Sequence, residues 1–101
     1  MRHLTRMEEL VMLSIMNLKQ NAYLVAIADH LSEVLEKKIS ITSVYLPLSR
    51  LEKKGFIKGE FGEATPVRGG RRKKIYQITK PGLGQLREYR RISDLLWNQD
   101  I

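Results

Sequence analysis

The chain has 101 residues, no cysteine and a formal net charge of +7. This length suits one domain rather than two, and the lack of cysteine excludes disulfides and cysteine-ligated metals. The apolar run at residues 10–16 is too short to cross a bilayer, and Glu8 and Glu9 interrupt the basic start that a secretion signal would have. We therefore expect a soluble, cytoplasmic protein with no membrane partner.

The excess positive charge lies in one third of the chain. Residues 50–80 contain ten basic and three acidic side chains, whereas the rest of the chain has no net charge. Solubility alone does not require such clustering, whereas clustered positive charge is typical of proteins that bind a polyanion. The charge pattern therefore predicts binding to nucleic acid.

Residues from about Thr5 to Lys19 have the periodicity of a helix that is apolar nearly all round. One face carries Met7, Leu10, Val11, Ser14 and Leu18, and other sides carry Met12, Leu13, Ile15 and Met16. A helix of this kind is buried on more than one side. In a small domain, this suggests that a second chain covers part of it.

Two further helices are expected before the middle of the chain. The first runs from about Ala22 to Leu35, with Asn21 as its N-cap. The second runs from about Thr42 to Lys54, with Ser40 or Thr42 as its cap and Gly55 at its C-terminal end. Pro47 predicts a bend or an irregular first turn in this helix. Its outward face carries Ser43, Tyr45, Pro47, Ser49, Arg50, Lys53 and Lys54.

The remainder of the chain predicts a β-hairpin and a last helix. Phe56–Gly62 and Lys74–Ile78 have the composition of strands, joined by the polar, basic segment Glu63–Lys73. Thr79 caps the last helix, and Pro81 lies near its first position. An apolar stripe along this helix consists of Leu83, Leu86, Tyr89, Ile92, Leu96 and Trp97.

The order helix, helix, helix, strand, strand, helix predicts a winged helix-turn-helix, a mainly α fold with a small β-hairpin (α+β). We assign residues 1–80 to the winged helix-turn-helix and residues 81–101 to a C-terminal dimerisation helix of the same domain. In such a fold the third helix enters the major groove of DNA, and a basic hairpin tip follows phosphates or enters the minor groove.

The sequence therefore suggests two sets of functional residues. DNA contacts are expected from Thr42, Ser43, Tyr45, Ser49, Arg50, Lys53 and Lys54 on the third helix, and from Arg68, Gly69, Gly70, Arg71, Arg72, Lys73 and Lys74 on the hairpin. A homodimer interface is expected from Met7, Val11, Leu86, Tyr89, Ile92, Leu96 and Trp97. Packing of the last helix on its own domain is the alternative to a dimer. A two-fold dimer suits a palindromic operator.

No pattern in the sequence points to catalysis or to a cofactor. His3 and His30 are far apart and lie in no metal-ligand motif. The pair Glu8 and Glu9 is interpreted as the negative charge that favours a helix N-terminus, rather than as a catalytic dyad. We expect a protein that is not an enzyme and binds no metal.

Four stretches together resemble the PadR family of transcriptional regulators: Glu9–Ile15, Asn21–Tyr23, Ser43–Gly55, and Arg68–Thr79 continuing to Gly82. The resemblance implies a dimer joined through the last and first helices, DNA contacts from the third helix and the wing, and usually repression of a neighbouring promoter. Some relatives bind small molecules between their subunits, so an effector is possible, although we interpret Trp97 as dimer packing. The chain departs from the family at Leu24, commonly glycine, and at Leu46, which separates Tyr45 from the proline.

Two other functions stay open at this point. A winged-helix module could bind DNA or RNA without sequence specificity, in which case the hairpin charges alone would be needed. A protein-interaction domain could instead use Tyr45, Leu46 and Pro47 to meet a partner protein.

Overall fold

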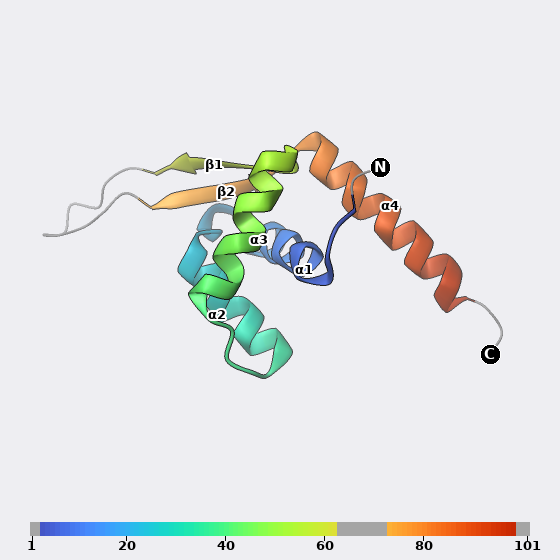
Figure 1. The fold of residues 1–101 in the computed structure, drawn as a ribbon, viewed down its shortest axis with the longest axis horizontal. Helices are drawn as coiled ribbons and strands as arrows, with labels where there is room; N and C mark the ends of the chain where they lie inside the picture. Colours follow the sequence, from blue (N-terminus) through green and yellow to red (C-terminus); the bar gives the residue numbers. More distant parts are fainter. Residues whose placement is uncertain (1–2, 63–72, 99–101) are drawn as a thin grey trace, which may run out of the picture.

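The computed structural model describes residues 3–62 and 73–98. Its elements, in chain order, are α1 (Arg6–Leu18), a 3-10 turn η1 (Lys19–Asn21), α2 (Leu24–Leu35), α3 (Ile41–Lys54), β1 (Ile57–Phe61), β2 (Lys74–Ile78) and α4 (Lys80–Trp97). The hairpin and α4 extend toward opposite ends of the molecule, with α1, α2 and α3 between them (Figure 1). The predicted element order and the α+β fold class are confirmed.

Hydroxyl side chains set the start of three helices. Thr5 precedes α1 in a capping box: its hydroxyl accepts from the Glu8 N–H (3.1 Å), and the Glu8 carboxylate accepts from the Thr5 N–H (2.7 Å). The Ser40 hydroxyl caps α3 by accepting from the Ser43 N–H, and Thr79 does the same for α4. These bonds satisfy N–H groups that have no partner within a helix. Of the two candidate caps for α3, Ser40 is the cap.

The start of α2 differs from the prediction. Asn21 lies in the turn η1, and Tyr23 occupies the N-cap position without a side-chain hydrogen bond. Tyr23 instead forms a β-bridge with Ile75, and the neighbouring Ala22 carbonyl accepts from the Tyr76 N–H (2.8 Å). Pairing with the hairpin therefore keeps this segment extended and delays the helix to Leu24.

The helix α3 is continuous from Ile41 to Lys54 with Pro47 inside it, so of the predicted bend or irregular first turn, the irregular turn is absent. Pro47 lacks the N–H that would bond to the carbonyl four residues earlier. Its ring is buried in the side of α3 that faces the core, where burial of apolar surface is favourable. The helix ends at Gly55, whose φ of 79° is a left-handed conformation that glycine adopts without strain.

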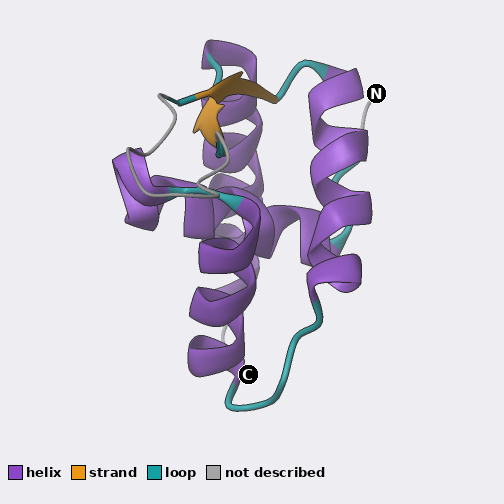
Figure 2. Ribbon diagram, turned by 90° about the vertical axis from the view of Figure 1, so that its left-hand side faces the viewer, coloured by secondary structure: helices purple, strands orange, loops and turns teal. Residues whose placement is uncertain are grey.

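The two strands form an antiparallel hairpin in which Ile57 pairs with Ile78 and Phe61 pairs with Lys74. β1 is one residue shorter at each end than predicted, so that Phe56 and Gly62 lie just outside it. The hairpin lies at one end of the helical layer, and the loop joining α2 to α3 lies at the opposite end (Figure 2). Most of the predicted basic tip, residues 63–72, lies outside the described residues.

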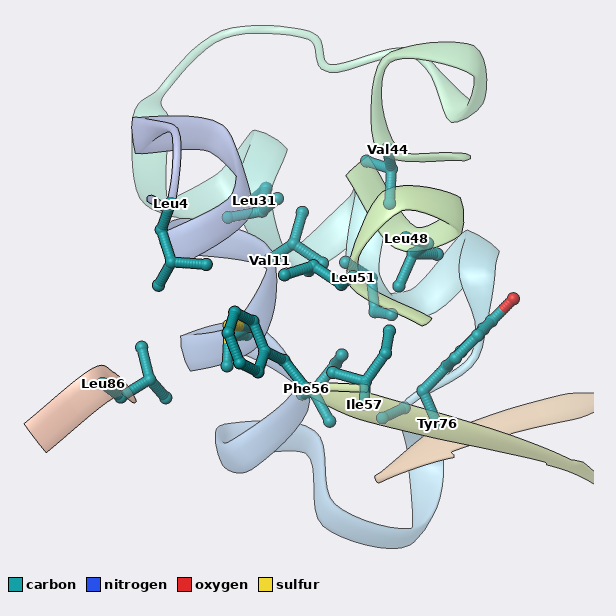
Figure 3. Packing of buried hydrophobic residues seen from close by; sticks show 14 of the residues in the cluster. Leu4, Val11, Leu31, Val44, Leu48, Leu51, Phe56, Ile57, Tyr76 and Leu86 are labelled. Atoms are coloured by element: carbon teal, nitrogen blue, oxygen red, sulfur yellow. The ribbon is translucent and has the colours of Figure 1, made fainter. Parts of the chain in front are cut away.

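One apolar core joins all the elements. The three central helices contribute residues such as Val11, Leu31 and Leu48 to this core, and the hairpin contributes Ile57 and Tyr76 (Figure 3). The buried face of α1 differs from the prediction by part of a turn. Met12 and Ile15 are fully buried, whereas Met7, Leu10 and Leu18 are half-buried. Leu13 and Met16 of α1 remain exposed, at 40% and 42%.

The first turn of α4 is attached to the start of β1. The Thr79 N–H donates to the Phe56 carbonyl (3.1 Å), and the Thr79 hydroxyl donates to the Gly55 carbonyl (2.7 Å). Farther along, the Tyr89 hydroxyl accepts from the Leu4 N–H (2.6 Å). The C-terminal part of α4 extends away from the rest of the chain (Figure 1).

Replacing Gly82 by alanine should lower the free energy of unfolding by about 3 kcal/mol, at the upper end of the cost of overpacking. A Cβ at this position would overlap the Phe56 carbonyl oxygen, which is backbone and cannot rotate away. Gly84 is the matched control, because a Cβ there meets nothing within 4 Å. Gly84→Ala should raise stability by about 0.5–1 kcal/mol through helix propensity. Urea unfolding at one fixed protein concentration measures both, and equal stability of the two variants would contradict the packing argument.

Candidate nucleic-acid interface

The outward side of α3 carries a mixed surface of polar and apolar side chains. Thr42, Leu46, Ser49 and Lys53 follow the i, i+4, i+7, i+11 spacing of a single helical stripe. All are exposed except Ser49, which is half-buried. The opposite side of the helix is buried and carries Val44, Pro47, Leu48 and Leu51. The prediction that Pro47 lies on the outward face is therefore wrong, because its ring packs on the core side of the helix. Ser43 and Tyr45 flank the stripe and are exposed as well.

A buried carboxylate lies under the C-terminal half of α3. Glu8 of α1 is fully buried, and its carboxylate oxygens lie 2.9 and 3.1 Å from the Lys54 ammonium and 3.4 Å from the Arg50 Nε. Lys54 also donates to the His3 carbonyl (2.9 Å). Two of the cations predicted to contact DNA are therefore paired within their own chain. The Arg50 side chain nevertheless keeps 49% of its surface exposed.

The electrostatic environment keeps Glu8 ionised. Burial on its own raises the pKa of this carboxyl, but the Thr5 N–H and the Lys54 ammonium lower it by more, so the pKa lies below its ordinary value. The sequence interpretation of Glu8 as helix N-terminal charge missed this second role. The available signal was its place in the apolar stripe of Leu4, Val11 and Ile15, where a carboxylate requires a cation.

The start of β2, at the loop end of the hairpin, brings two lysines to the same side as α3. The Lys73 ammonium lies 4.1 Å from the centroid of the Tyr23 ring, and its side chain is exposed. Lys74 is half-buried and forms a 3.0 Å ion pair with Glu52, which raises the pKa of Lys74. Lys73 is therefore the better placed of the two for an external partner. The other hairpin residues predicted to bind DNA, Arg68, Gly69, Gly70, Arg71 and Arg72, lie outside the described residues.

A cleft of about 450 Å³ connects these elements. Its lining comes from the start of α2, from α3 and from the hairpin: Tyr23, Leu24, Val25, Tyr45, Lys73, Lys74 and Tyr76. The walls are therefore largely aromatic and aliphatic, with ammonium groups at one side. Such a surface can pack against sugars and base edges while its cations meet phosphates.

The residues predicted to form a dimer interface differ in how much of their surface is exposed. Val11 has no exposed surface, because it packs into the core of its own chain, so it cannot contact a second chain. Leu86 also packs into this core, and 6% of its surface stays exposed. Met7 and Tyr89 are half-buried. Ile92, Leu96 and Trp97 are exposed at 39%, 67% and 77%, and Leu95, which the sequence analysis did not include, is exposed at 54%.

The described part of the chain lacks two other kinds of feature, a metal-binding cluster and a membrane-spanning helix. Among residues 3–62 and 73–98, no group of three or more His, Cys, Asp or Glu side chains is arranged to bind a metal ion. No helix in these two segments has the length and apolar character needed to cross a membrane.

Comparison with known proteins identifies the family. The model of the PadR-like family of transcriptional regulators matches residues 12–88. A PadR-like transcription factor from Bacteroides fragilis is 27% identical, with a TM-score of 0.74 over 88% of this chain and 81% of that one. A PadR family regulator from Eggerthella lenta is 28% identical, with a TM-score of 0.69 over 88% and 75% of the two chains.

A more distant similarity supports the fold alone. The circadian clock associated protein Pex from Anabaena is 19% identical, with a TM-score of 0.62 over 89% of this chain and 80% of that one. A search of curated proteins found no match. The matched family consists of transcriptional regulators rather than enzymes. Because its model covers most of the chain, this protein belongs to the PadR-like family of transcriptional regulators and is a DNA-binding regulator.

Proposed function

We propose that this protein is a homodimeric repressor that binds a palindromic operator with sequence specificity. The observation that carries the proposal is the exposed outward side of α3, which shares a cleft with the start of β2 in the basic hairpin. In a winged helix, such a helix lies in the major groove while the hairpin meets the flanking backbone. Repression follows where the operator overlaps a promoter, because bound protein then blocks access to it.

The structure supports different roles for the cations of α3. Lys53 is exposed on the outward stripe and is assigned to a DNA phosphate. Arg50 is assigned to a guanine, because the contact of its Nε with Glu8 orients a guanidinium that stays half exposed. Lys54 is assigned to the support of α3 rather than to DNA, since it pairs with buried Glu8. Lys74 is likewise paired, with Glu52.

The proposed dimer rests on an exposed apolar helix end and on a cleft between α1 and α4. Leu95, Leu96 and Trp97 lie at the exposed end of α4. Between α1 and α4 lies a cleft of about 410 Å³, lined by Glu9, Leu13, Met16, Leu83, Leu86, Arg87, Arg90, Ser93 and Asp94. A two-fold axis would place the end of each α4 in the cleft of the other chain. The two α3 helices would then meet half-sites about one DNA turn, ~34 Å, apart.

The test is a fluorescence-anisotropy titration against the DNA upstream of the protein's own gene and against a scrambled duplex of the same length, at two salt concentrations. Tighter binding to the native duplex is expected. Equal, salt-dependent binding to both duplexes would favour the non-specific winged-helix module. A folded protein that binds neither duplex would favour a protein-interaction domain.

In the same titration, Lys53→Gln should weaken binding to every duplex and reduce the slope of log K against log salt concentration. The loss of one phosphate contact changes this slope by about 0.9, and so by about two for a dimer. Lys19→Gln is the matched control, because Lys19 is exposed but lies in η1 beside Ile15 and Met16 at the end of α1, rather than next to α3. An unchanged slope for Lys53→Gln would remove this side chain from the DNA contacts.

A further inference from the structure

Leu46 is an apolar side chain in the middle of a polar stripe. It is 54% exposed, and its neighbours along the stripe are Thr42, Ser49 and Lys53. Packing within the chain does not account for this leucine, because the buried side of α3 is the opposite one. The proposed dimer surface does not account for it either, because that surface consists of α1 and α4.

We propose that Leu46 reads the 5-methyl group of a thymine in each half of the operator. This inference rests on the proposed function, in which the outward stripe of α3 lies in the major groove. The thymine methyl is the one apolar group that the base edges present there, and aliphatic side chains contact it. The other base edges present hydrogen-bonding groups, which a leucine would leave without partners. Leu46 thus favours thymine and disfavours the other bases at its position.

The surroundings of Leu46 favour DNA over an apolar protein partner. Lys53 lies on the same stripe, and Lys73 lies at the edge of the cleft that Tyr45, the neighbour of Leu46, helps to line. The third of the chain that includes Arg50, Lys53 and Lys73 carries the whole excess of positive charge. An apolar protein surface has no negative charge to pair with these cations. A DNA duplex has phosphates along both edges of the major groove and thymine methyl groups within it, so it can contact the cations and Leu46 together.

The experiment needs a duplex that the protein itself selects from a randomised library. In this duplex, each thymidine is replaced in turn by deoxyuridine, which lacks only the methyl group, and affinity is measured by anisotropy. One thymine position in each half-site should be sensitive to the replacement. Replacing it in a single half-site should lower the affinity about fourfold, and replacing it in both half-sites should lower the affinity about 15-fold, as expected for the loss of one buried methyl per subunit.

A substitution in the protein completes the test. Leu46→Ala should bind the thymine and uracil duplexes equally and keep the salt dependence of the parent, because no charge is changed. Val34→Ala is the control, since Val34 is also an exposed aliphatic side chain, at 59%, but lies on α2. This variant should keep the full preference for thymine.

Two outcomes would overturn the inference, and they can be told apart from failure of the proposed function. If the library yields a preferred sequence but no uracil replacement weakens binding, or if Leu46→Ala keeps the thymine preference, Leu46 does not read the methyl group. If the library yields no preferred sequence, sequence-specific binding itself fails and the inference fails with it.

Discussion

Replacing Lys54 by methionine should lower the free energy of unfolding at neutral pH by about 3 kcal/mol, at the lower end of the cost of breaking a buried ion pair. The substitution keeps much of the alkyl chain but leaves the buried Glu8 carboxylate without its nearest cation. Arg50, 3.4 Å away, and the Thr5 N–H remain and hold the cost below that of a wholly unpaired charge. Lys53→Met is the matched control, because Lys53 is the next residue in the chain and its side chain is exposed. That variant should unfold like the parent.

The stability of the parent and the stability of Lys54→Met should depend on pH in opposite directions through Glu8. In the parent, the folded-state pKa of Glu8 lies below its ordinary value of 4.5. The stability that it contributes is therefore complete above that value and is lost as the pH falls through the folded-state pKa. In Lys54→Met, burial dominates and should raise the pKa of Glu8, so that protonation relieves the unpaired charge. The stability difference between parent and variant should thus be largest near pH 7 and shrink below about pH 5.

A second substitution separates the ion pair from simple packing. Glu8→Gln retains a side-chain oxygen for the capping box but carries no charge. The double variant Glu8→Gln, Lys54→Met should therefore be more stable at neutral pH than Lys54→Met alone. Urea unfolding at constant protein concentration gives all the values. A cost of Lys54→Met that is the same at pH 4 and pH 7, together with strictly additive single variants, would show that Glu8 and Lys54 do not act as a pair.

The local signals in the sequence predicted the elements well because short-range hydrogen bonds and backbone preferences set their ends. Ser40 and Thr79 accept the bonds expected of helix caps, and Gly55 has the left-handed conformation expected of a terminating glycine. The error at Asn21 has a non-local cause. The edge of β2 pairs with Tyr23, and this contact joins residues more than 50 positions apart in the chain. Periodicity along one segment contains no information about such a contact.

The candidate site was predictable to a similar extent. The outward side of α3 follows from helical spacing, and the exposure of Thr42, Tyr45 and Lys53 agrees with it. The pairing of Lys54 and Arg50 with Glu8 was missed, because it depends on how α1 crosses α3. Leu46 was left out of the DNA contacts because such contacts were sought among polar side chains, although major-groove recognition also includes apolar contacts.

The helix α1 takes part in both candidate surfaces through adjacent residues. Glu8 faces α3 and pairs with its cations, whereas Glu9 lines the cleft between α1 and α4. Leu13 and Met16, the exposed apolar residues of α1, also line this cleft. Any chain that fills the cleft therefore packs against the same helix that supports α3.

Replacing Leu96 by glutamate should convert the proposed dimer to a monomer. Leu96 is 67% exposed within its own chain, so the charge is tolerated by a monomer but would be desolvated in an apolar interface. A two-fold interface contains the substitution twice, which doubles the cost. Sedimentation equilibrium measures the mass, and circular dichroism confirms the fold. Val34→Glu changes the same kind of side chain to the same charge at 59% exposure on α2, and this control should remain a dimer.

Loss of the dimer should lower the affinity for a palindromic operator by about 100-fold or more, because linkage gives the second half-site an effective concentration near the millimolar range. The monomer should still bind an isolated half-site as well as a single subunit of the parent does, since α3 and the hairpin are unchanged. Comparing the affinities for the operator and for the half-site distinguishes loss of the dimer from loss of a direct DNA contact by α4. Loss of such a contact would weaken half-site binding too. A Leu96→Glu protein that stays dimeric would move the interface away from the end of α4. A monomer that keeps full operator affinity would show instead that each half-site is bound independently.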